Sequence, residues 1–326
     1  MTLRNLTIRL LLAASTIAVF SSVGAPPALA AAPLHHAQVP GFYRTMVGDF
    51  EVTALFDGGV AVDSSILLAD PALVKDLLAK SHIDDPKNVW GSASAFLVNT
   101  GSKLILIDTG TGGHWGGPGL GHLASNLKAA GYRPDQVDLV LVTHLHADHV
   151  GGIYDAQGQP AFPNARIRMN KADSDFWLSK DVAAKAPKEA QIFFQVARDS
   201  AAPYLAKGQW APFEGLAELV PGIRPYPIPG HTPGHTGYLI SSRGDSLLIW
   251  GDTAHFESVQ MAHPEIGVGW DIDSPTAIKA RQELFAKLAA DGTLIAAAHM
   301  PFPSLGRLRT DGSGYAWAPV PFMNLN

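Results

Sequence analysis

The feature that most constrains this chain is the segment 144–149, which has the sequence His-Leu-His-Ala-Asp-His and directly follows an apolar stretch. Side chains two residues apart at the end of a strand point to the same side, so His144 and His146 can bind one ligand together. The chain then turns, which lets Asp148 and His149 point to a second position nearby. Metal ions would neutralise and order this cluster, whereas a solvated histidine-rich loop leaves it unexplained. The segment therefore predicts two adjacent metal sites.

Three later segments offer the ligands that one loop alone cannot supply. A turn constrained by glycine and proline carries His231 and His235. Asp252 follows an apolar strand, where an unpaired charge would be costly. His299 ends a run of three alanines at the end of another apolar strand. Taken singly, each of these could be an ordinary capping or core residue; together with the first motif they form a candidate ligand set.

The chain contains no cysteine, so a metal can be held only by imidazole and carboxylate. This donor set favours zinc, with manganese, iron or cobalt as alternatives. The formal charge is −5 and no run of Lys or Arg is present. This composition gives no electrostatic basis for binding nucleic acid or an anionic membrane surface.

Residues 1–30 have the pattern of a secretory signal peptide. Arg4 and Arg9 make a basic start, residues 10–23 are apolar, and Ala28-Leu-Ala30 fits a cleavage site. The apolar stretch is too short for a stable membrane span, although an uncleaved anchor is the alternative. We predict a mature chain that is periplasmic or secreted and is not stably inserted in a membrane.

Apolar periodicity predicts one α/β domain over residues 31–326. The expected strands cover 50–56, 95–99, 103–108, 137–143, 166–169, 238–241, 246–250 and 294–298, and the expected helices cover 122–130, 171–180, 188–199 and 274–290. Asp57-Gly-Gly59 is expected to be the turn that ends the first strand. Most candidate ligands follow strand ends, where the binding loops of α/β proteins converge.

The four motifs, H-x-H-x-D-H, G-H-T-P-G-H, G-D and a strand-terminal His, occur in the order that resembles the metallo-β-lactamase superfamily. The resemblance implies an αβ/βα sandwich, in which two mixed β-sheets pack face to face with helices outside and metals at one edge. It implies one metal on His144, His146 and His231, and another on Asp148, His149 and His299, with Asp252 bridging. His235 would then not bind a metal and would instead hold the ligands or the turn in place.

Departures from family patterns narrow the activity. The β-lactamases with a cysteine ligand are excluded, other β-lactamases usually lack the bridging carboxylate, and diiron oxidoreductases have H-x-E-x-D where residue 146 is His. The stretches 48–55, 162–165, 175–179 and 295–299 resemble exported methyl parathion hydrolase-like proteins, a group with lactonases and aryl esterases. This resemblance implies a small, apolar, uncharged ester as substrate and a homodimer as assembly.

The expected reaction is hydrolysis by a hydroxide that bridges two divalent ions, since two cations lower the pKa of a shared water from ~15.7 toward neutrality. Lactones or aryl esters are favoured because the loop 66–69 is apolar, whereas phosphotriester-hydrolysing members tend to have a basic residue there. Those members also tend to have an aliphatic residue at the position of His255. An organophosphate triester hydrolase is the alternative function, and a non-catalytic zinc-binding protein is a remote one.

Two residues are predicted to be catalytic: Asp252 as the bridge, and His255 three residues later. The imidazole of His255 could polarise a carbonyl or protonate a leaving group, or it could be a pocket wall. Candidates for an apolar substrate pocket, each of which could instead be ordinary core, are Leu67, Trp115, Trp177, Phe193, Phe194 and Trp270. Trp115 is the best placed, because its glycine-rich segment 112–117 cannot form a core helix or strand.

Overall fold

The computed structural model describes residues 32, 34–36 and 38–325, so the signal peptide predicted at 1–30 lies outside the described residues. The chain divides into a short N-terminal unit, Met1–Val39, and a compact unit, Pro40–Asn326. The structure below is that of the compact unit. Within the described residues, every helix is too short or too polar to cross a bilayer.

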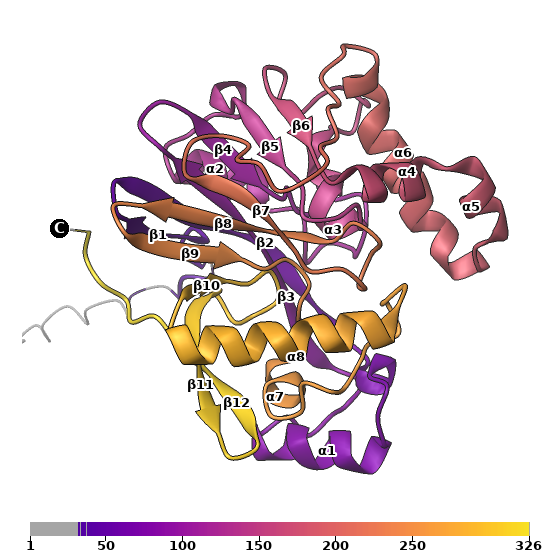
Figure 1. Cartoon of the computed structure of the whole chain (residues 1–326), viewed down its shortest axis with the longest axis vertical. Coiled ribbons are helices and arrows are strands. Elements are labelled where there is room, and N and C mark those ends of the chain that lie inside the picture. The colour runs from indigo at the N-terminus through magenta and orange to yellow at the C-terminus, as the bar shows by residue number, and fades with distance from the viewer. Residues whose placement is uncertain (1–31, 33, 37, 326) are drawn as a thin grey trace, which may run out of the picture. The chain divides into compact units, whose positions relative to one another are not determined.

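Two mixed β-sheets of six strands each form the framework (Figure 1). The first has the order β1-β2-β3-β4-β5-β6, with β1 Phe42–Val47, β2 Phe50–Val62, β3 Val89–Asn99, β4 Leu104–Ile107, β5 Leu139–Leu141 and β6 Arg166–Arg168. Strands β1 to β4 pair antiparallel, and β4, β5 and β6 pair parallel. This sheet is drawn in indigo to magenta.

The second sheet, drawn in orange to yellow in Figure 1, has the order β12-β11-β10-β9-β8-β7. Its strands are β7 Ile223–Pro227, β8 Thr236–Ser242, β9 Asp245–Ile249, β10 Leu294–Ala296, β11 Leu305–Asp311 and β12 Gly314–Pro319. Only β9 and β10 pair parallel, and their neighbours pair antiparallel. Each half of the compact unit therefore contributes one sheet.

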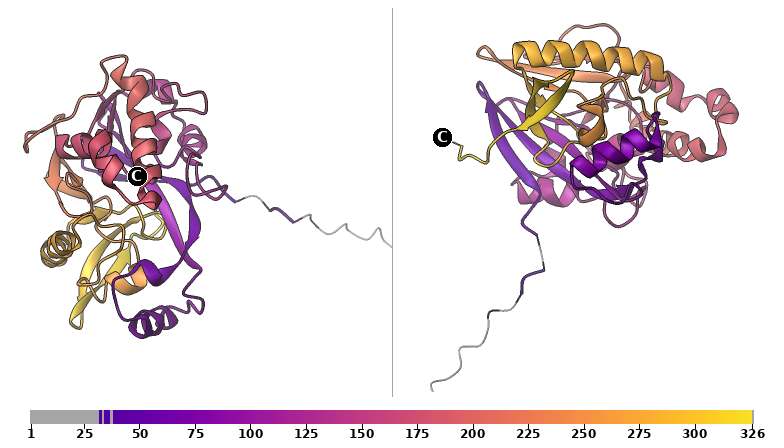
Figure 2. Two further views of the ribbon diagram at one scale, coloured as in Figure 1. Left: turned by 90° about the vertical axis from the view of Figure 1, so that its right-hand side faces the viewer. Right: turned by 90° about the horizontal axis from the view of Figure 1, so that it is seen from below.

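Helices cover the outer faces of the sheets (Figure 2). The α-helices are α1 Pro71–Lys80, α2 Leu123–Ala129, α3 Ala147–Val150, α4 Lys171–Leu178, α5 Lys180–Lys185, α6 Gln191–Leu205, α7 Glu257–Gln260 and α8 Ser274–Asp291, and the short 3-10 turns are η1 Ser64–Ile66, η2 Pro134–Gln136, η3 Gly151–Ile153 and η4 Lys188–Ala190. Residues of α2, α4 and α6 pack on the first sheet, and residues of α8 pack on the second.

The alternation of side chains along the strands explains this layering. In β9, Leu247 and Ile249 face the first sheet, whereas Leu248 between them faces α8. In β4, Ile105 faces the second sheet and Leu106 faces the helices on the other side. Since successive side chains of a strand point to opposite faces, continuous apolar runs bury both faces of a sheet. The predicted sandwich of two mixed sheets with outer helices is confirmed.

The predicted turn at Asp57-Gly-Gly59 is wrong, because β2 continues through it to Val62. The register with β3 shifts between Phe56 and Gly58, so the extra residue forms a β-bulge. A Cβ on Gly58 would lie 2.0 Å from the carbonyl oxygen of Gly119, and its φ is +139°. The glycine is thus required by a close approach of two backbones rather than by a turn.

Two predicted helices also differ from the structure. The helix expected at 171–180 is two helices, because Ser179 ends α4 and its Oγ accepts a hydrogen bond (3.2 Å) from the N–H of Val182 in α5. The helix expected at 188–199 begins as the 3-10 turn η4 and continues as α6 to Leu205.

Candidate metal centre

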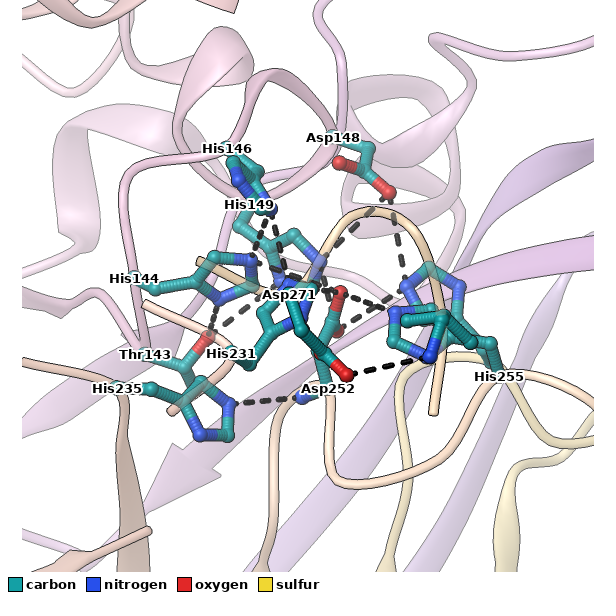
Figure 3. A network of polar contacts seen from close by, with 12 residues as sticks. Thr143, His144, His146, Asp148, His149, His231, His235, Asp252, His255 and Asp271 are labelled. Atoms are coloured by element: carbon teal, nitrogen blue, oxygen red, sulfur yellow. Dashed lines mark hydrogen bonds and ion pairs between the residues drawn. The ribbon is translucent and has the colours of Figure 1, made fainter. Parts of the chain in front are cut away.

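All seven predicted ligands lie together, on segments that join or follow strands of both sheets (Figure 3). His144 and His146 lie between β5 and α3, and α3 itself carries Asp148 and His149. The other three ligands come from the turn before β8, from the end of β9 and from the end of β10, and they are His231, Asp252 and His299. The buried strands therefore deliver the polar side chains to one place.

A first group of ligand atoms converges around His146. Its Nδ1 lies 3.0 Å from Nε2 of His144 and 3.0 Å from Nε2 of His231. Oδ2 of Asp252 lies 3.5 Å from Nε2 of His144 and 3.2 Å from Nε2 of His231. Burial holds the pKa of His144 and His146 well below the ordinary value, so both imidazoles are in the neutral form that binds metals. This group suits one cation.

The second group faces the other oxygen of the same carboxylate. Oδ1 of Asp252 lies 2.9 Å from Nε2 of His149 and 3.1 Å from Nε2 of His299. Oδ2 of Asp148 lies 3.7 Å from Nε2 of His149 and 3.6 Å from Nε2 of His299. Asp252 thus presents one oxygen to each group, which is the arrangement of a bridging ligand.

Buried atoms without partners support the presence of cations. Within the described residues, Nε2 of His149, Nε2 of His299 and Oδ1 of Asp252 are buried and make no hydrogen bond. A buried polar atom without a partner costs about 1–3 kcal/mol, so a cluster of three requires an explanation. Two cations would coordinate all three atoms. The histidine and aspartate cluster therefore suits a dinuclear metal site.

Residues behind the ligands fix the orientation of the imidazoles. Nδ1 of His149 donates to Oδ2 of Asp108 (2.9 Å), and Nδ1 of His231 donates to Oδ1 of Asp271 (2.9 Å). Nδ1 of His299 donates to the carbonyl oxygen of Ser92 (2.7 Å). These bonds leave each Nε2 free to bind a metal.

The same hydrogen-bond network continues to His144. Its Nδ1 lies 3.0 Å from Oγ1 of Thr143, whose hydroxyl donates to Oδ2 of Asp108 (2.8 Å). Asp108 therefore supports a ligand of each group.

The protonation of His231 depends on two carboxylates. Burial lowers the pKa of His231, but Asp252 and Asp271 outweigh it and raise this pKa to about 9. Without a cation, these carboxylates favour a protonated imidazole at this position.

His235 does not belong to either group. Its Nδ1 donates to the carbonyl oxygen of Ile228 (2.7 Å), and its Nε2 accepts a hydrogen bond (2.9 Å) from the backbone N–H of Asp252. Burial lowers its pKa to about 3, so the ring is neutral. Gly251 has φ +57° and a Cβ there would lie 2.5 Å from Nε2 of His235. His235 thus positions the carboxylate of Asp252 through the backbone.

His255 borders the centre on the cavity side. Its Nε2 lies 3.0 Å from Oδ2 of Asp252, and its ring stacks on that of His299 at 5.1 Å. Gln260 holds its backbone by accepting a hydrogen bond (2.7 Å) from the N–H of His255. Burial lowers the pKa of His255 to about 4, so its imidazole is neutral at neutral pH. The ring is also close enough to Asp252 and His299 to share a cation with them.

A cavity of about 800 Å³ opens above both groups. Its wall includes the ligands His146, Asp148, His231, Asp252 and His299, the ring of His255, and the aromatic side chains of Trp115, Trp177, Phe193 and Trp270. No Lys or Arg occurs among the lining residues that the structure describes. The cavity therefore fits an apolar molecule without negative charge.

Two predicted pocket residues lie elsewhere. Leu67 is buried and packs in the core formed around α1 and α7, whereas its neighbour Ile66 faces the cavity. Phe194 is buried against Trp177, with ring centroids 4.6 Å apart, whereas its neighbour Phe193 faces the cavity. Consecutive residues of a helix point about 100° apart, so only one of two adjacent phenylalanines can line a cavity.

Three supporting residues were not identified from the sequence: Asp108, Thr143 and Asp271. Asp108 directly follows β4, just as Asp252 follows β9, so its position at a strand end was a usable signal. The apolar pattern of 137–143 predicts Thr143 only as the last residue of a strand. For Asp271, in the segment between α7 and α8, we find no local pattern that marks its role.

The chain is similar to proteins of a known family. The family model described as Metallo-beta-lactamase superfamily matches residues 88–299. An N-acyl homoserine lactonase of Bacillus cereus is 29% identical over 123 residues, which is 38% of this chain and 40% of that protein. The chain thus matches about two fifths of the length of that curated relative.

Two solved structures are similar over nearly their whole length. The hydrolase AbOPH, described as in the beta lactamase superfamily, has a TM-score of 0.83 and 39% identity and covers 88% of this chain and 100% of its own. AidC is described as a dizinc quorum-quenching lactonase in complex with the product N-hexanoyl-L-homoserine. It has a TM-score of 0.78 and 28% identity, and the similarity covers 87% of this chain and 99% of AidC. With the sandwich fold, the ligand cluster and the match over 88–299, this chain belongs to the metallo-beta-lactamase superfamily.

Proposed function

We propose that this protein is a dinuclear metal-dependent hydrolase of small uncharged esters, with lactones or aryl esters as preferred substrates. One observation carries the proposal: Asp252 divides its two oxygens between two ligand groups at the base of an apolar cavity. Two divalent ions bound there, zinc before manganese, iron or cobalt, would supply an acidified water and a Lewis acid.

The chain's own residues would bind and orient the ester. Trp115, Trp177 and Phe193 offer apolar surface beside the first group, with the ring of Phe193 5.4 Å from that of His146. The neutral ring of His255 carries one proton, and a carbonyl or leaving oxygen beside Asp252 could accept it in place of the carboxylate, whose Oδ2 lies 3.0 Å from Nε2. Binding the apolar part of the substrate excludes water from the rest of the cavity.

The similar proteins support a lactone as the first substrate to test. The Bacillus cereus relative and AidC are both named as lactonases, and the AidC structure holds the product of lactone opening. An organophosphate triester hydrolase is the second candidate, because a cavity lined without Lys or Arg in the described residues would also admit an uncharged phosphotriester. A non-catalytic zinc-binding protein fits less well, since closed coordination would not need an open cavity.

Export and a homodimer belong to the same proposal. The basic start, apolar stretch and small residues of 1–30 support cleavage and a periplasmic or secreted mature chain. N-terminal sequencing of the protein from its host and sedimentation of the purified chain test these two expectations.

A substrate panel tests the proposed activity. We expect an uncharged γ- or δ-lactone, or a phenyl ester, to have a higher kcat/KM than a dialkyl aryl phosphotriester. Esters with a free carboxylate should be poor substrates, and so should β-lactam antibiotics, which are cyclic amides with a carboxylate, because no Lys or Arg lines the cavity in the described chain. A phosphotriester preferred by tenfold or more, ~1.4 kcal/mol of transition-state stabilisation, would reverse the order of the two candidates.

The role of His255 is tested by His255→Ala. We expect this variant to keep both metal ions but to lower kcat for esters roughly 10- to 100-fold, at or below the usual range of acid–base assistance. Phosphotriesters with good leaving groups should be unaffected, because they need no proton from the protein. Metal content and kcat are measured on the same preparation. His263→Ala is the matched control, since this histidine pairs with Glu265 near the surface.

The possible outcomes separate the roles of His255. Loss of a metal ion in His255→Ala would make it a ligand, in line with its position beside Asp252 and His299. Unchanged ester turnover with both ions present would make it a wall of the cavity.

A further inference from the structure

Asp173, on α4, is a fully buried carboxylate outside both ligand groups. Its Oδ2 accepts a hydrogen bond (3.0 Å) from the backbone N–H of Leu145. Its Oδ1 accepts one (2.7 Å) from the backbone N–H of Gly234. The two oxygens thus hold two segments that are far apart in the sequence.

The two donors lie inside the ligand motifs of the first group. Leu145 stands between His144 and His146, and Gly234 belongs to the turn that begins at His231. One side chain therefore connects the segments that carry all three imidazoles of the first group. The second group relies on different supports, namely Asp108 for His149 and the carbonyl of Ser92 for His299.

The packing around Asp173 leaves little freedom for this connection to stretch. A Cβ on Gly234 would lie 2.6 Å from the backbone nitrogen of Asp173, so the turn touches the start of α4 directly. Asn170 caps that helix by accepting a hydrogen bond (2.9 Å) from the N–H of Ala172. The helix start is therefore a fixed base against which both ligand segments are held.

A carboxylate suits this position better than an amide. Both of its oxygens face N–H donors, and an asparagine would turn its NH₂ toward one of them. Burial raises the pKa of Asp173 to about 6, so above pH 7 the group is largely ionised and both oxygens accept. Among the described residues no Lys or Arg forms an ion pair with Asp173, so hydrogen bonds from Thr232 and from the backbone N–H groups of Gly234 and Leu145 are what favour its charged form.

We infer that Asp173 is a positioning residue that sets the metal affinity of the first group by holding the segment 144–146 against the turn 231–235. The inference rests on the proposed dinuclear centre. Because a lost supporting hydrogen bond typically weakens metal binding 10- to 100-fold, Asp173→Asn should raise the dissociation constant of the first-group ion by about that factor. The second group should keep its affinity.

Two variant backgrounds isolate the groups. In full-length Asp148→Ala, the remaining zinc ion reports on the first group, and adding Asp173→Asn should weaken it about 10- to 100-fold in competition with a chelator at pH 8. In His231→Ala, the remaining ion reports on the second group, and adding Asp173→Asn should leave its affinity unchanged. Asp175→Asn, an exposed neighbour on α4 that pairs with Lys171, is the matched control.

The outcomes are distinguishable from those of the proposed function. An equal loss of affinity in both backgrounds would show a general structural role and overturn the inference, as would no loss in Asp148→Ala. If Asp173→Asn does not fold, Gly234→Ala tests the same contact, because the added Cβ would clash with the backbone nitrogen of Asp173. This variant should also weaken metal binding in the first group and not in the second. A wild-type chain that binds fewer than two ions would instead refute the dinuclear centre itself.

Discussion

Replacement of Asp252 by alanine is expected to release metal from both groups and to lower kcat/KM for the best ester by at least about 10³-fold, ~4 kcal/mol. The reason is geometric. Its two oxygens lie 2.9 Å from His149 and 3.2 Å from His231, in different ligand groups, so one substitution removes a ligand from each. Elemental analysis of the purified variant gives the number of ions per chain, and circular dichroism shows whether it is folded.

Asp311→Ala is the control for this experiment, because this exposed aspartate at the end of β11 forms an ion pair only with Arg309 among the described residues. Asp252→Asn keeps the volume of the side chain and one acceptor oxygen, so it separates loss of charge from loss of packing. Full metal content in Asp252→Ala would show that the carboxylate does not bridge the ions.

His231→Ala and His235→Ala are expected to give opposite results, although the two histidines belong to one turn. His231 directs its Nε2 toward His146 and Asp252. His231→Ala should therefore lose the first-group ion, and its kcat/KM should fall by more than about 100-fold. His235 uses both ring nitrogens for hydrogen bonds to backbone groups. Its loss should keep both ions and reduce stability by ~1–3 kcal/mol, because buried partners lose their hydrogen bonds.

Elemental analysis and thermal unfolding of the two variants make this comparison. The expected pattern is a metal deficit with His231→Ala and a lower Tm, without a deficit, with His235→Ala. A larger metal loss in His235→Ala than in His231→Ala would make His235 the metal ligand and His231 the supporting residue.

The cluster of histidines and aspartates could be predicted because each of its members is marked locally. A polar side chain directly after an apolar strand, as at Asp252 or His299, is visible in a short window of sequence. The residues that support them are not marked in this way. Asp173 is 28 residues from Leu145 and 61 from Gly234, and nothing near it in the sequence shows that it binds either. Long-range hydrogen bonds need the fold to be known first.

The same limit explains the errors in the fold. Asp57-Gly-Gly59 has the chemistry of a turn, but the contact that requires Gly58 comes from Gly119, far along the chain. The buried strands β4, β5, β9 and β10 have apolar runs and were predicted, whereas β1, β7, β11 and β12 were not. These four lie at or near sheet edges, where the apolar pattern is weaker.

Each candidate ligand group takes residues from the loops of both sheets, so neither half of the chain contains a complete group. A nascent chain that has reached only the end of α3 offers two ligands to each group, His144 and His146 or Asp148 and His149. The missing partners arrive with the turn before β8 and with the ends of β9 and β10. In the proposed centre, the first group is therefore complete only once Asp252 follows β9, and the second only once His299 follows β10, so each ion can bind only after strands of both sheets have formed.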